Sequence, residues 1–291
     1  MHCEVIAEVG ECFNGDFDTA LNMIHIASEC GCDTVKFQLL DMDEVDESDP
    51  EYDWFSKLEL DPDKIEKLIE KSRNEKIEIL FTPVSVKTAM WLYDVNQRSV
   101  KIASSFVGKR DLLQYIRNHF SIIYASTGMA SMDEINIMLD ILKENNPEIK
   151  LLHCVSEYPT GPLLNTRGLR ALDEMDVHLE MMSMLKDYYR DFCIGYSDHT
   201  DDIFVPVIAV AMGAEVIEKH FTLDRSTPIE HLKNGLEYMG TDHVLSIEPR
   251  DMKEMVHQIR RVEAIKGNRV WERSSGEKLL KEFLHGRYQK R

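Results

Sequence analysis

Short β-rich runs alternate with amphipathic segments along nearly the whole chain, and this alternation constrains the fold more than any other feature. Helix-like segments follow the β-rich runs, for example at Asp18–Cys30, Asp63–Asn74, Met132–Asn145 and Asp251–Ile265. Eight successive βα units predict an α/β fold, a single-domain (β/α)8 TIM barrel. The strand-like runs are Cys3–Val9, Asp33–Leu39, Ile77–Pro83, Val100–Ser104, Ile122–Ser126, Lys150–Val155, Cys193–Ser197 and Glu215–Phe221.

An open, doubly wound sheet is the alternative that the same alternation leaves open. Such a sheet usually carries a glycine-rich G-x-G-x-x-G turn after its first strand. Here the first turn, from Gly10 to Gly15, reads G-E-C-F-N-G and does not match. The length of 291 residues is normal for one barrel, which therefore remains the favoured fold.

The composition excludes several functions. The net charge of −18 argues against a nucleic-acid surface and against anionic membranes. No apolar run reaches the roughly 18–20 residues that span a bilayer, and the N-terminus leads into Cys3–Val9 without a signal-peptide pattern. The six cysteines form no C-x-x-C pair and mostly lie in apolar stretches. We therefore expect a cytoplasmic protein with reduced thiols.

Two segments depart from the βα rhythm. Asp41–Glu51 carries seven acidic residues in eleven, and it is either a solvated loop after the second strand or a lid over a substrate. The tail Lys266–Arg291 holds eight Lys or Arg against three Glu and predicts an exposed, partly helical extension. We therefore expect a barrel over residues 1–266 and a C-terminal extension over residues 267–291.

Polar and ionisable side chains gather where the predicted strands end. In a parallel barrel these ends converge on one mouth, where active sites are built. A barrel strand rarely tolerates a lysine unless an anion or a carboxylate pairs with it. The residues at the strand ends are Glu8, Lys36, Gln38, Thr82, Lys101, Ser104, Ser126, Thr127, Ser156, Tyr158, Ser197, Asp198, His199, Glu218 and His220.

These side chains predict two kinds of chemistry. The lysines and hydroxyls form a nest of donors for a phosphate and a carboxylate. His199 and His220, with Glu8, Asp198, Glu218 or Asp242 nearby, form a nitrogen and oxygen site for Mn²⁺, Mg²⁺, Fe²⁺ or Zn²⁺. Each feature also has a purely structural interpretation. A single histidine at a strand end is often a hydrogen-bonded structural residue, and Lys36 can simply pair with Glu8.

A series of motifs, in one order from residue 3 to about residue 266, resembles the sialic acid synthase family, which comprises N-acetylneuraminate synthase and its legionaminate and pseudaminate relatives. The motifs are A-E-V-G at Ala7–Gly10, N-G-D at Asn14–Asp16, V-K-F-Q at Val35–Gln38, T-P at Thr82–Pro83, K-I-A-S at Lys101–Ser104, S-T-G-M at Ser126–Met129, L-H-C-x-S-x-Y-P at Leu152–Pro159, G-Y-S-D-H-T at Gly195–Thr200, E-K-H-F-T-L-D at Glu218–Asp224 and S-I-E-P at Ser246–Pro249.

The resemblance implies a transferase that condenses phosphoenolpyruvate with an N-acyl amino sugar, such as N-acetylmannosamine, to give a nonulosonic acid and phosphate. His199 and His220 would hold a divalent metal, usually Mn²⁺, and Glu8, Glu218 and Asp242 would face the metal, its waters or the sugar aldehyde. It also implies a homo-oligomer, most simply a dimer. The implied substrate-binding residues are Lys36, Gln38, Thr82, Lys101, Ser104, Ser126 and Ser197 around phosphoenolpyruvate, with Ser156 and Tyr158 near the sugar.

The chain departs from the family pattern in four places. Cys12 and Phe13 stand where the family usually has Asn-His, and the acidic loop is shorter than the family's. An insertion at Ile229–Thr241 precedes Asp242, which we match to the family's aspartate, with His231 as the other contender. The chain also stops where the linker to the family's C-terminal antifreeze-like domain would begin.

Two other functions stay open from the sequence. A Schiff-base aldolase would use Lys101 or Lys36 and would need no metal. A non-catalytic barrel would bind phosphoenolpyruvate or a sugar, or would need a separately encoded antifreeze-like partner. Because the motifs do not specify the sugar, N-acetylmannosamine, its 6-phosphate and diamino sugars all remain candidate acceptors.

Overall fold

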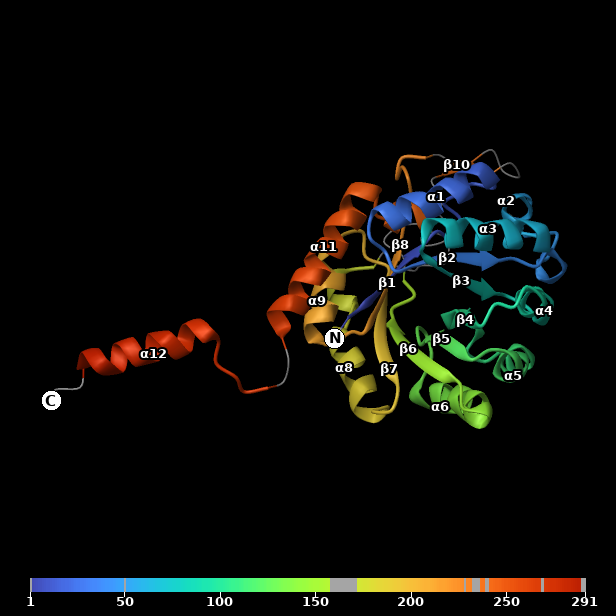
Figure 1. Ribbon diagram of the computed structural model, residues 1–291. Coiled ribbons are helices and arrows are strands. Elements are labelled where there is room, and N and C mark those ends of the chain that lie inside the picture. The colour runs from blue at the N-terminus through green and yellow to red at the C-terminus, as the bar shows by residue number, and fades with distance from the viewer. Residues whose placement is uncertain are drawn as a thin grey trace.

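The computed structural model describes residues 2–49, 51–157, 172–227, 229–231, 236–238, 241–267 and 270–288, without the side chains of 229–231, 236–238 and 241. Eight parallel strands form the centre of the molecule, and helices surround them (Figure 1). Hydrogen bonds join the strands in the order β3-β2-β1-β8-β7-β6-β5-β4, and β3 also lies beside β4, so the sheet comes round on itself. The predicted (β/α)8 barrel is confirmed. The strands are β1 (Glu4–Glu8), β2 (Thr34–Leu39), β3 (Glu78–Pro83), β4 (Ser99–Ile102), β5 (Ile122–Ser126), β6 (Glu148–Cys154), β7 (Cys193–Asp198) and β8 (Val216–His220).

The helices begin and end at residues that favour those positions. Ser131 and Glu134 form a reciprocal capping box at the start of α6. Gly213 ends α9 in the left-handed conformation, at φ 114°, which glycine adopts without steric cost. The helices are α1 (Phe17–Glu29), α2 (Tyr52–Leu58), α3 (Pro62–Glu75), α4 (Val86–Asp94), α5 (Arg110–His119), α6 (Met132–Leu142), α8 (Leu179–Tyr188), α9 (Phe204–Met212), α10 (Thr241–Leu245), α11 (Pro249–Lys266) and α12 (Ser275–Tyr288). A short antiparallel pair, β9 (Ile229–His231) and β10 (Leu236–Tyr238), precedes α10.

The inside of the barrel is arranged in layers, as the three inward-facing residues of β1 illustrate. Successive side chains of a strand point to opposite faces, so Glu4, Ile6 and Glu8 all point inward. Glu4, at the N-terminal end, accepts hydrogen bonds from Tyr124 Oη at 2.8 Å and Lys150 Nζ at 2.8 Å. Ile6 belongs to a buried apolar cluster in the middle. Glu8 begins a polar layer at the C-terminal mouth.

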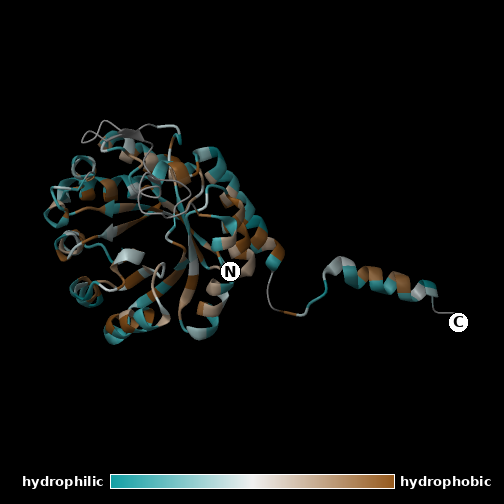
Figure 2. Ribbon diagram, turned by 180° about the vertical axis from the view of Figure 1, so that it is seen from behind, coloured by the Kyte–Doolittle hydropathy of each residue, from teal (hydrophilic) through white to brown (hydrophobic). Residues whose placement is uncertain are grey.

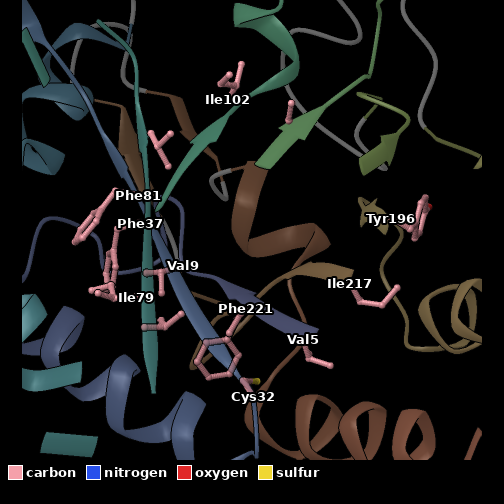
Figure 3. Packing of buried hydrophobic residues seen from close by; sticks show 14 of the residues in the cluster. Val5, Val9, Cys32, Phe37, Ile79, Phe81, Ile102, Tyr196, Ile217 and Phe221 are labelled. Atoms are coloured by element: carbon pink, nitrogen blue, oxygen red, sulfur yellow. The ribbon is translucent and has the colours of Figure 1, made fainter. Parts of the chain in front are cut away.

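The larger apolar core lies between the barrel and its helices. Outward-facing strand residues such as Phe37, Phe81 and Ile217 are fully buried there and pack under the helices (Figure 3). Burial of this kind stabilises the fold by about 25 cal/mol for each Å² of apolar surface removed from water. The rigid wall that results fixes the direction of every inward-facing side chain at the mouth.

Helix α12 extends away from the barrel (Figure 1). Its hydrophobic residues are exposed, including Leu279 at 69% and Phe283 at 63%, and Figure 2 shows them along the helix in brown. The predicted domain boundary after residue 266 and the predicted dimer stay predictions. Within the described part of the chain, no helix has both the length and the apolar character to cross a membrane.

Gly195 on β7 offers a test of how tightly the barrel is packed. A Cβ atom added there would lie 2.5 Å from Val216 O and 2.6 Å from Leu152 Cδ2. We expect Gly195→Ala to lower the free energy of unfolding by about 1–3 kcal/mol, because the clash involves the backbone of a neighbouring strand. Gly108→Ala is the matched control, since no atom lies within 4 Å of its added Cβ. Equal denaturant midpoints for the two variants would contradict this account of the packing.

Candidate active site

Four charged side chains form a buried cluster at the C-terminal mouth. Lys36 Nζ lies 3.1 Å from Glu8 Oε2 and 3.0 Å from Glu218 Oε2. Lys101 Nζ lies 3.1 Å from the other oxygen of Glu218, which also accepts a 2.8 Å hydrogen bond from Ser197 Oγ. All four charged residues are at most 4% exposed. The structure therefore brings together residues from β1, β2, β4, β7 and β8, as the sequence predicted, and it also shows the simple pairing of Lys36 with Glu8.

The cluster treats its two carboxylates differently. Burial raises the pKa of Glu8 to about 7, although Lys36 opposes this shift. Burial acts on Glu218 in the same direction, but Lys101 and Lys36 together hold the pKa of Glu218 far below its usual range. Glu8 thus takes up a proton more readily than an ordinary glutamate, whereas Glu218 stays ionised.

The two lysines also differ, because Lys36 faces two carboxylates and Lys101 faces one. Burial disfavours the charged form of both. For Lys36, the attraction of Glu218 and Glu8 outweighs burial and raises the pKa. For Lys101, burial prevails and lowers the pKa. The ammonium of Lys101 is therefore the less well compensated of the two, and an anion from outside would stabilise it.

Hydroxyl groups surround this cluster. The Oγ1 atom of Thr82 and the Oγ atom of Ser126 are buried and have no hydrogen-bond partner among the residues that the structure describes. The backbone N–H of Gly128 donates to Ser104 Oγ at 3.1 Å. A Cβ atom on Gly128 would lie 2.2 Å from Ser156 Oγ, so only glycine lets these two serines converge. Because buried polar atoms are nearly always paired, the unpaired hydroxyls mark a place for a ligand.

A pair of histidines lies beside the cluster. The rings of His199 and His220 are 5.3 Å apart between centroids. His199 Nδ1 lies 2.9 Å from Val155 O, whereas the buried Nδ1 atom of His220 has no hydrogen-bond partner in the described part of the chain. Asp242 Oδ2 lies 3.8 Å from that atom. Burial, together with His199, keeps the pKa of His220 well below its usual value, so its imidazole is neutral.

This donor set matches a divalent metal that takes two imidazoles and leaves its other positions open. A neutral imidazole and an adjacent carboxylate are ordinary ligands for Mn²⁺, Fe²⁺ or Zn²⁺. Over the described ranges, no group of three or more His, Cys, Asp and Glu side chains is arranged to hold a metal ion. The two histidines, with the unpaired nitrogen of His220, are therefore the donors on which a metal hypothesis rests.

The sequence suggested Asp198 as a possible metal-site carboxylate, and the structure places its side chain elsewhere. Its carboxylate accepts hydrogen bonds from Lys219 Nζ at 2.6 Å, Thr200 Oγ1 at 2.7 Å and Tyr196 Oη at 2.8 Å. Ser197 points into the barrel, so its neighbour on the strand points out of it. Asp198 therefore belongs to a structural network behind the barrel wall.

Glu11 is a mouth residue that the sequence analysis missed. Its backbone N–H donates to Asp242 Oδ2 at 3.1 Å, and its carboxylate accepts from Trp54 Nε1 at 3.0 Å. Gly10 makes this approach possible, because a Cβ on it would lie 2.2 Å from Asp242 Oδ2. Burial, reinforced by the Asp242 charge, raises the pKa of Glu11 to about 8. The signal in the sequence was a carboxylate directly after the glycine that ends the first strand.

Cys154 is a second missed residue, at the end of β6. Its Sγ atom lies 3.6 Å from His199 Nδ1 and 3.6 Å from Ser156 Oγ. Burial works against ionisation, but the adjacent His199 lowers the pKa of the thiol to about 7. The thiol is thus in contact with a residue that the sequence assigned to the metal.

The departures from the family pattern have structural explanations. Cys12 Sγ lies 3.5 Å from Ser246 Oγ, and the Phe13 ring packs edge-on against Phe37. Both side chains are buried, so this pair fills the core under the first loop. Tyr158 lies outside the described residues, as do the side chains of the insertion Ile229–Thr241 with His231.

The acidic loop is tied to the barrel rather than fully solvated. Asp41 is buried and accepts from Ser85 Oγ at 2.6 Å and Lys87 Nζ at 2.9 Å. Glu44 forms an ion pair with Lys109. The first part of the loop is therefore fixed beside β3 and α4, on the rim of the mouth.

Two cavities flank the charged cluster. One, of about 300 Å³, includes Gln38 and Thr82 in its lining, and the other, of about 550 Å³, includes Cys154 and Ser156. Gln38 Nε2 donates to Glu8 Oε1 at 3.1 Å and so connects the first cavity to the cluster. The mouth thus has room for small molecules beside the ends of β2 and β3 and beside the ends of β5 and β6.

The fold and the mouth define a (β/α)8 barrel with a charged small-molecule site at the C-terminal ends of its strands. The chain belongs to the NeuB family, whose model matches residues 23–270. It is 36% identical to an uncharacterized protein of Methanocaldococcus jannaschii, over 94% of this chain and 73% of that protein. It is 32% identical to the N,N'-diacetyllegionaminic acid synthase of Legionella pneumophila, over 92% of this chain and 74% of that synthase. The solved N-acetylneuraminic acid (sialic acid) synthetase of Leptospira borgpetersenii, in complex with citrate, has a TM-score of 0.85 and 30% identity, and the match covers 100% of this chain and 94% of that one.

Proposed function

We propose that this protein condenses phosphoenolpyruvate with the aldehyde group of an N-acyl amino sugar, releasing phosphate and a nonulosonic acid. The observation that carries the proposal is the pair of buried lysines at the mouth, surrounded by the unpaired hydroxyls of Thr82 and Ser126. Membership of the NeuB family and the similarity to the named legionaminic and sialic acid synthases support the same reaction class.

Lys36 and Lys101 hold the phosphate and carboxylate of phosphoenolpyruvate in this proposal. An anion that enters between them replaces contacts that the lysines now make with Glu8 and Glu218. When Glu8 carries a proton, two ammonium groups face a single charged carboxylate, so the cluster has an excess positive charge. Such a site attracts an anion in spite of the acidic surface.

His199 and His220 would hold a divalent metal, which we propose to be Mn²⁺ and which when bound supplies Lewis-acid polarisation of the sugar's aldehyde oxygen. The neutral, unpaired imidazole of His220 supports this assignment. Asp242, 3.8 Å from His220, is in position to orient water or the sugar beside the two histidines.

The remaining residues position the reactants and move protons. A carbon–carbon bond forms between the methylene carbon of phosphoenolpyruvate and the aldehyde carbon, and water adds to the cationic C2 that results. Phosphate then leaves with its bridging oxygen as the C2–O bond breaks. We assign the proton transfer from water to Glu8, because burial raises its pKa and lets it take up a proton. We assign the pairing with both lysines to Glu218, which stays ionised.

The test is to incubate the protein with phosphoenolpyruvate, Mn²⁺ and a panel of N-acyl hexosamines, and to follow phosphate release and product mass. We expect metal-dependent release of phosphate that, in ¹⁸O-labelled water, carries no label, because water attacks carbon. Full turnover after exhaustive chelation would contradict the metal assignment. Borohydride trapping of a keto acid on a lysine would support a Schiff-base aldolase instead. Phosphoenolpyruvate binding without phosphate release would support a non-catalytic barrel.

A further inference from the structure

The 300 Å³ cavity at the mouth has apolar walls. Phe13, Leu40, Phe55, Val84 and Phe106 line it, and they come from the loop after β1, the ends of β2 and β3, α2, and the turn after β4. Phe13 is held rigidly in the core, while the other four side chains are partly accessible from the cavity side. A wall built largely of phenyl rings and branched carbons favours contact with carbon rather than with hydroxyl groups.

The cavity is also unfavourable for an anion. Among the described residues that line it there is no Lys, Arg or His, but there is Glu11, whose backbone contacts the buried Asp242 carboxylate. The ammonium of Lys109 lies behind the wall, where it is paired with Glu44 and donates to Val84 O at 2.9 Å. A phosphate in this cavity would thus meet no free cation among the described lining residues, which makes its burial costly in a partly desolvated site.

The inner end of the cavity is polar and joins the charged cluster. Thr82, which the proposed function places beside phosphoenolpyruvate, has a buried Oγ1 without a partner among the described residues, and Gln38 donates to Glu8, so this end of the cavity borders the phosphoenolpyruvate site. A molecule in the cavity would meet hydrogen-bonding groups at its inner end and apolar rings farther out. This distribution matches a substrate with a polar, reacting end and a methyl-bearing end.

We propose that this cavity receives an uncharged, methyl-bearing part of the acceptor, so that the preferred acceptor is a neutral N-acyl sugar and not a sugar phosphate. The inference rests on the proposed function and specifies its acceptor class. The methyl group comes from one of two sources, the N-acyl group or a deoxygenated terminal carbon of the sugar. In either case Phe106 and Leu40 determine the specificity by excluding polar or bulky groups.

The first experiment compares acceptors at fixed phosphoenolpyruvate and Mn²⁺. We expect N-acetylmannosamine to exceed its 6-phosphate in kcat/KM by at least about 30-fold, because the phosphate has no counter-charge in the cavity. Two pairs of acceptors identify which methyl group enters the cavity. N-acetyl against N-formyl mannosamine tests the N-acyl methyl, and a 6-deoxy diacetamido sugar against its 6-hydroxy counterpart tests the terminal methyl. Loss of one methyl group lowers kcat/KM by about 10-fold or more in the pair that probes the cavity. Equal values in both pairs would overturn the proposal.

The second experiment enlarges the cavity. In Phe106→Ala, the kcat/KM for N-propanoyl, N-butanoyl or 6-extended acceptors should rise about 10-fold relative to that for the parent acceptor. The KM for phosphoenolpyruvate should stay within about 2-fold of the wild-type value. Phe106→Leu should restore most of the original preference, and Leu40→Ala provides a second enlargement if Phe106→Ala folds poorly. Phe204→Ala, an exposed phenyl on α9, is the matched control and should change nothing.

The outcomes separate this inference from the proposed function. Turnover that favours the 6-phosphate, or an unchanged acceptor preference in both enlarged variants, would overturn the inference and leave phosphoenolpyruvate condensation intact. A lack of phosphate release with every acceptor would overturn both.

Discussion

Lys36→Met should weaken the binding of phosphoenolpyruvate at least about 100-fold, because it removes the cation that lies between two buried carboxylates. The same substitution should lower the free energy of unfolding by about 3–5 kcal/mol, since Glu8 and Glu218 would remain buried with less compensation. Calorimetric titration with phosphoenolpyruvate measures the first effect, and denaturant unfolding measures the second. Lys101→Met should weaken binding similarly with a smaller loss of stability, because Lys101 pairs with one carboxylate only.

The stability loss in Lys36→Met should depend on pH, and the pKa shifts of Glu8 and Glu218 determine whether it grows or shrinks as pH rises. Glu8 has a folded-state pKa of about 7, above its unfolded value, so it favours the native state at low pH and disfavours it as pH rises from about 4.5 to 7. Glu218 has a depressed pKa and stabilises the native protein above its unfolded pKa of about 4.5. Without Lys36, ionised Glu8 destabilises the native state more, and ionised Glu218 stabilises it less. The difference in stability between wild type and Lys36→Met should therefore be larger at pH 8 than at pH 5.

Lys150→Met is the matched control at the other end of the barrel. Lys150 also pairs with a glutamate on β1, since its Nζ lies 2.8 Å from Glu4 Oε2. The control should lose stability but keep the wild-type affinity for phosphoenolpyruvate. If Lys36→Met and Lys101→Met both bind phosphoenolpyruvate as tightly as wild type, the lysines are structural and the assignment of the anion site is wrong.

The sequence predicted the barrel and most of its mouth because both follow from short-range rules. Alternating βα units leave few folds available, and a lysine at an inward-facing strand position needs a nearby anion. Lys36, Lys101, Glu8 and Glu218 lie together for that reason. The prediction for Asp198 was wrong because side chains alternate along β7. A strand that points Ser197 inward must point the next residue outward.

The residues that the sequence did not reveal depend on long-range contacts. Glu11 reaches Asp242, 231 residues away, only through the left-handed turn at Gly10. The apolar cavity combines side chains from five separate segments, and no local pattern links Phe13 with Phe106. Loop paths depend on the packing of the whole molecule, so single-sequence patterns specify strand ends better than the loops that connect them.

His220→Leu should separate metal binding from stability more sharply than any other substitution at the mouth. Within the described ranges the buried Nδ1 atom of His220 has no hydrogen-bond partner, so a polar group is left uncompensated there. Removing it should leave the free energy of unfolding unchanged or raise it by up to about 1 kcal/mol. The affinity for Mn²⁺, measured by titration calorimetry without substrate, should fall at least about 100-fold, because one of two protein donors is lost.

His243→Leu is the control, because His243, in α10, is also buried but has both nitrogens paired. Its Nδ1 lies 2.8 Å from Thr222 Oγ1 and its Nε2 lies 2.8 Å from Asn14 Oδ1. The control should lose about 1–3 kcal/mol of stability for the partners left unpaired, while its Mn²⁺ affinity stays close to wild type. The two variants thus have opposite expected results in both measurements. If His220→Leu instead loses as much stability as His243→Leu and binds Mn²⁺ normally, His220 is a packing residue and the metal must be held elsewhere.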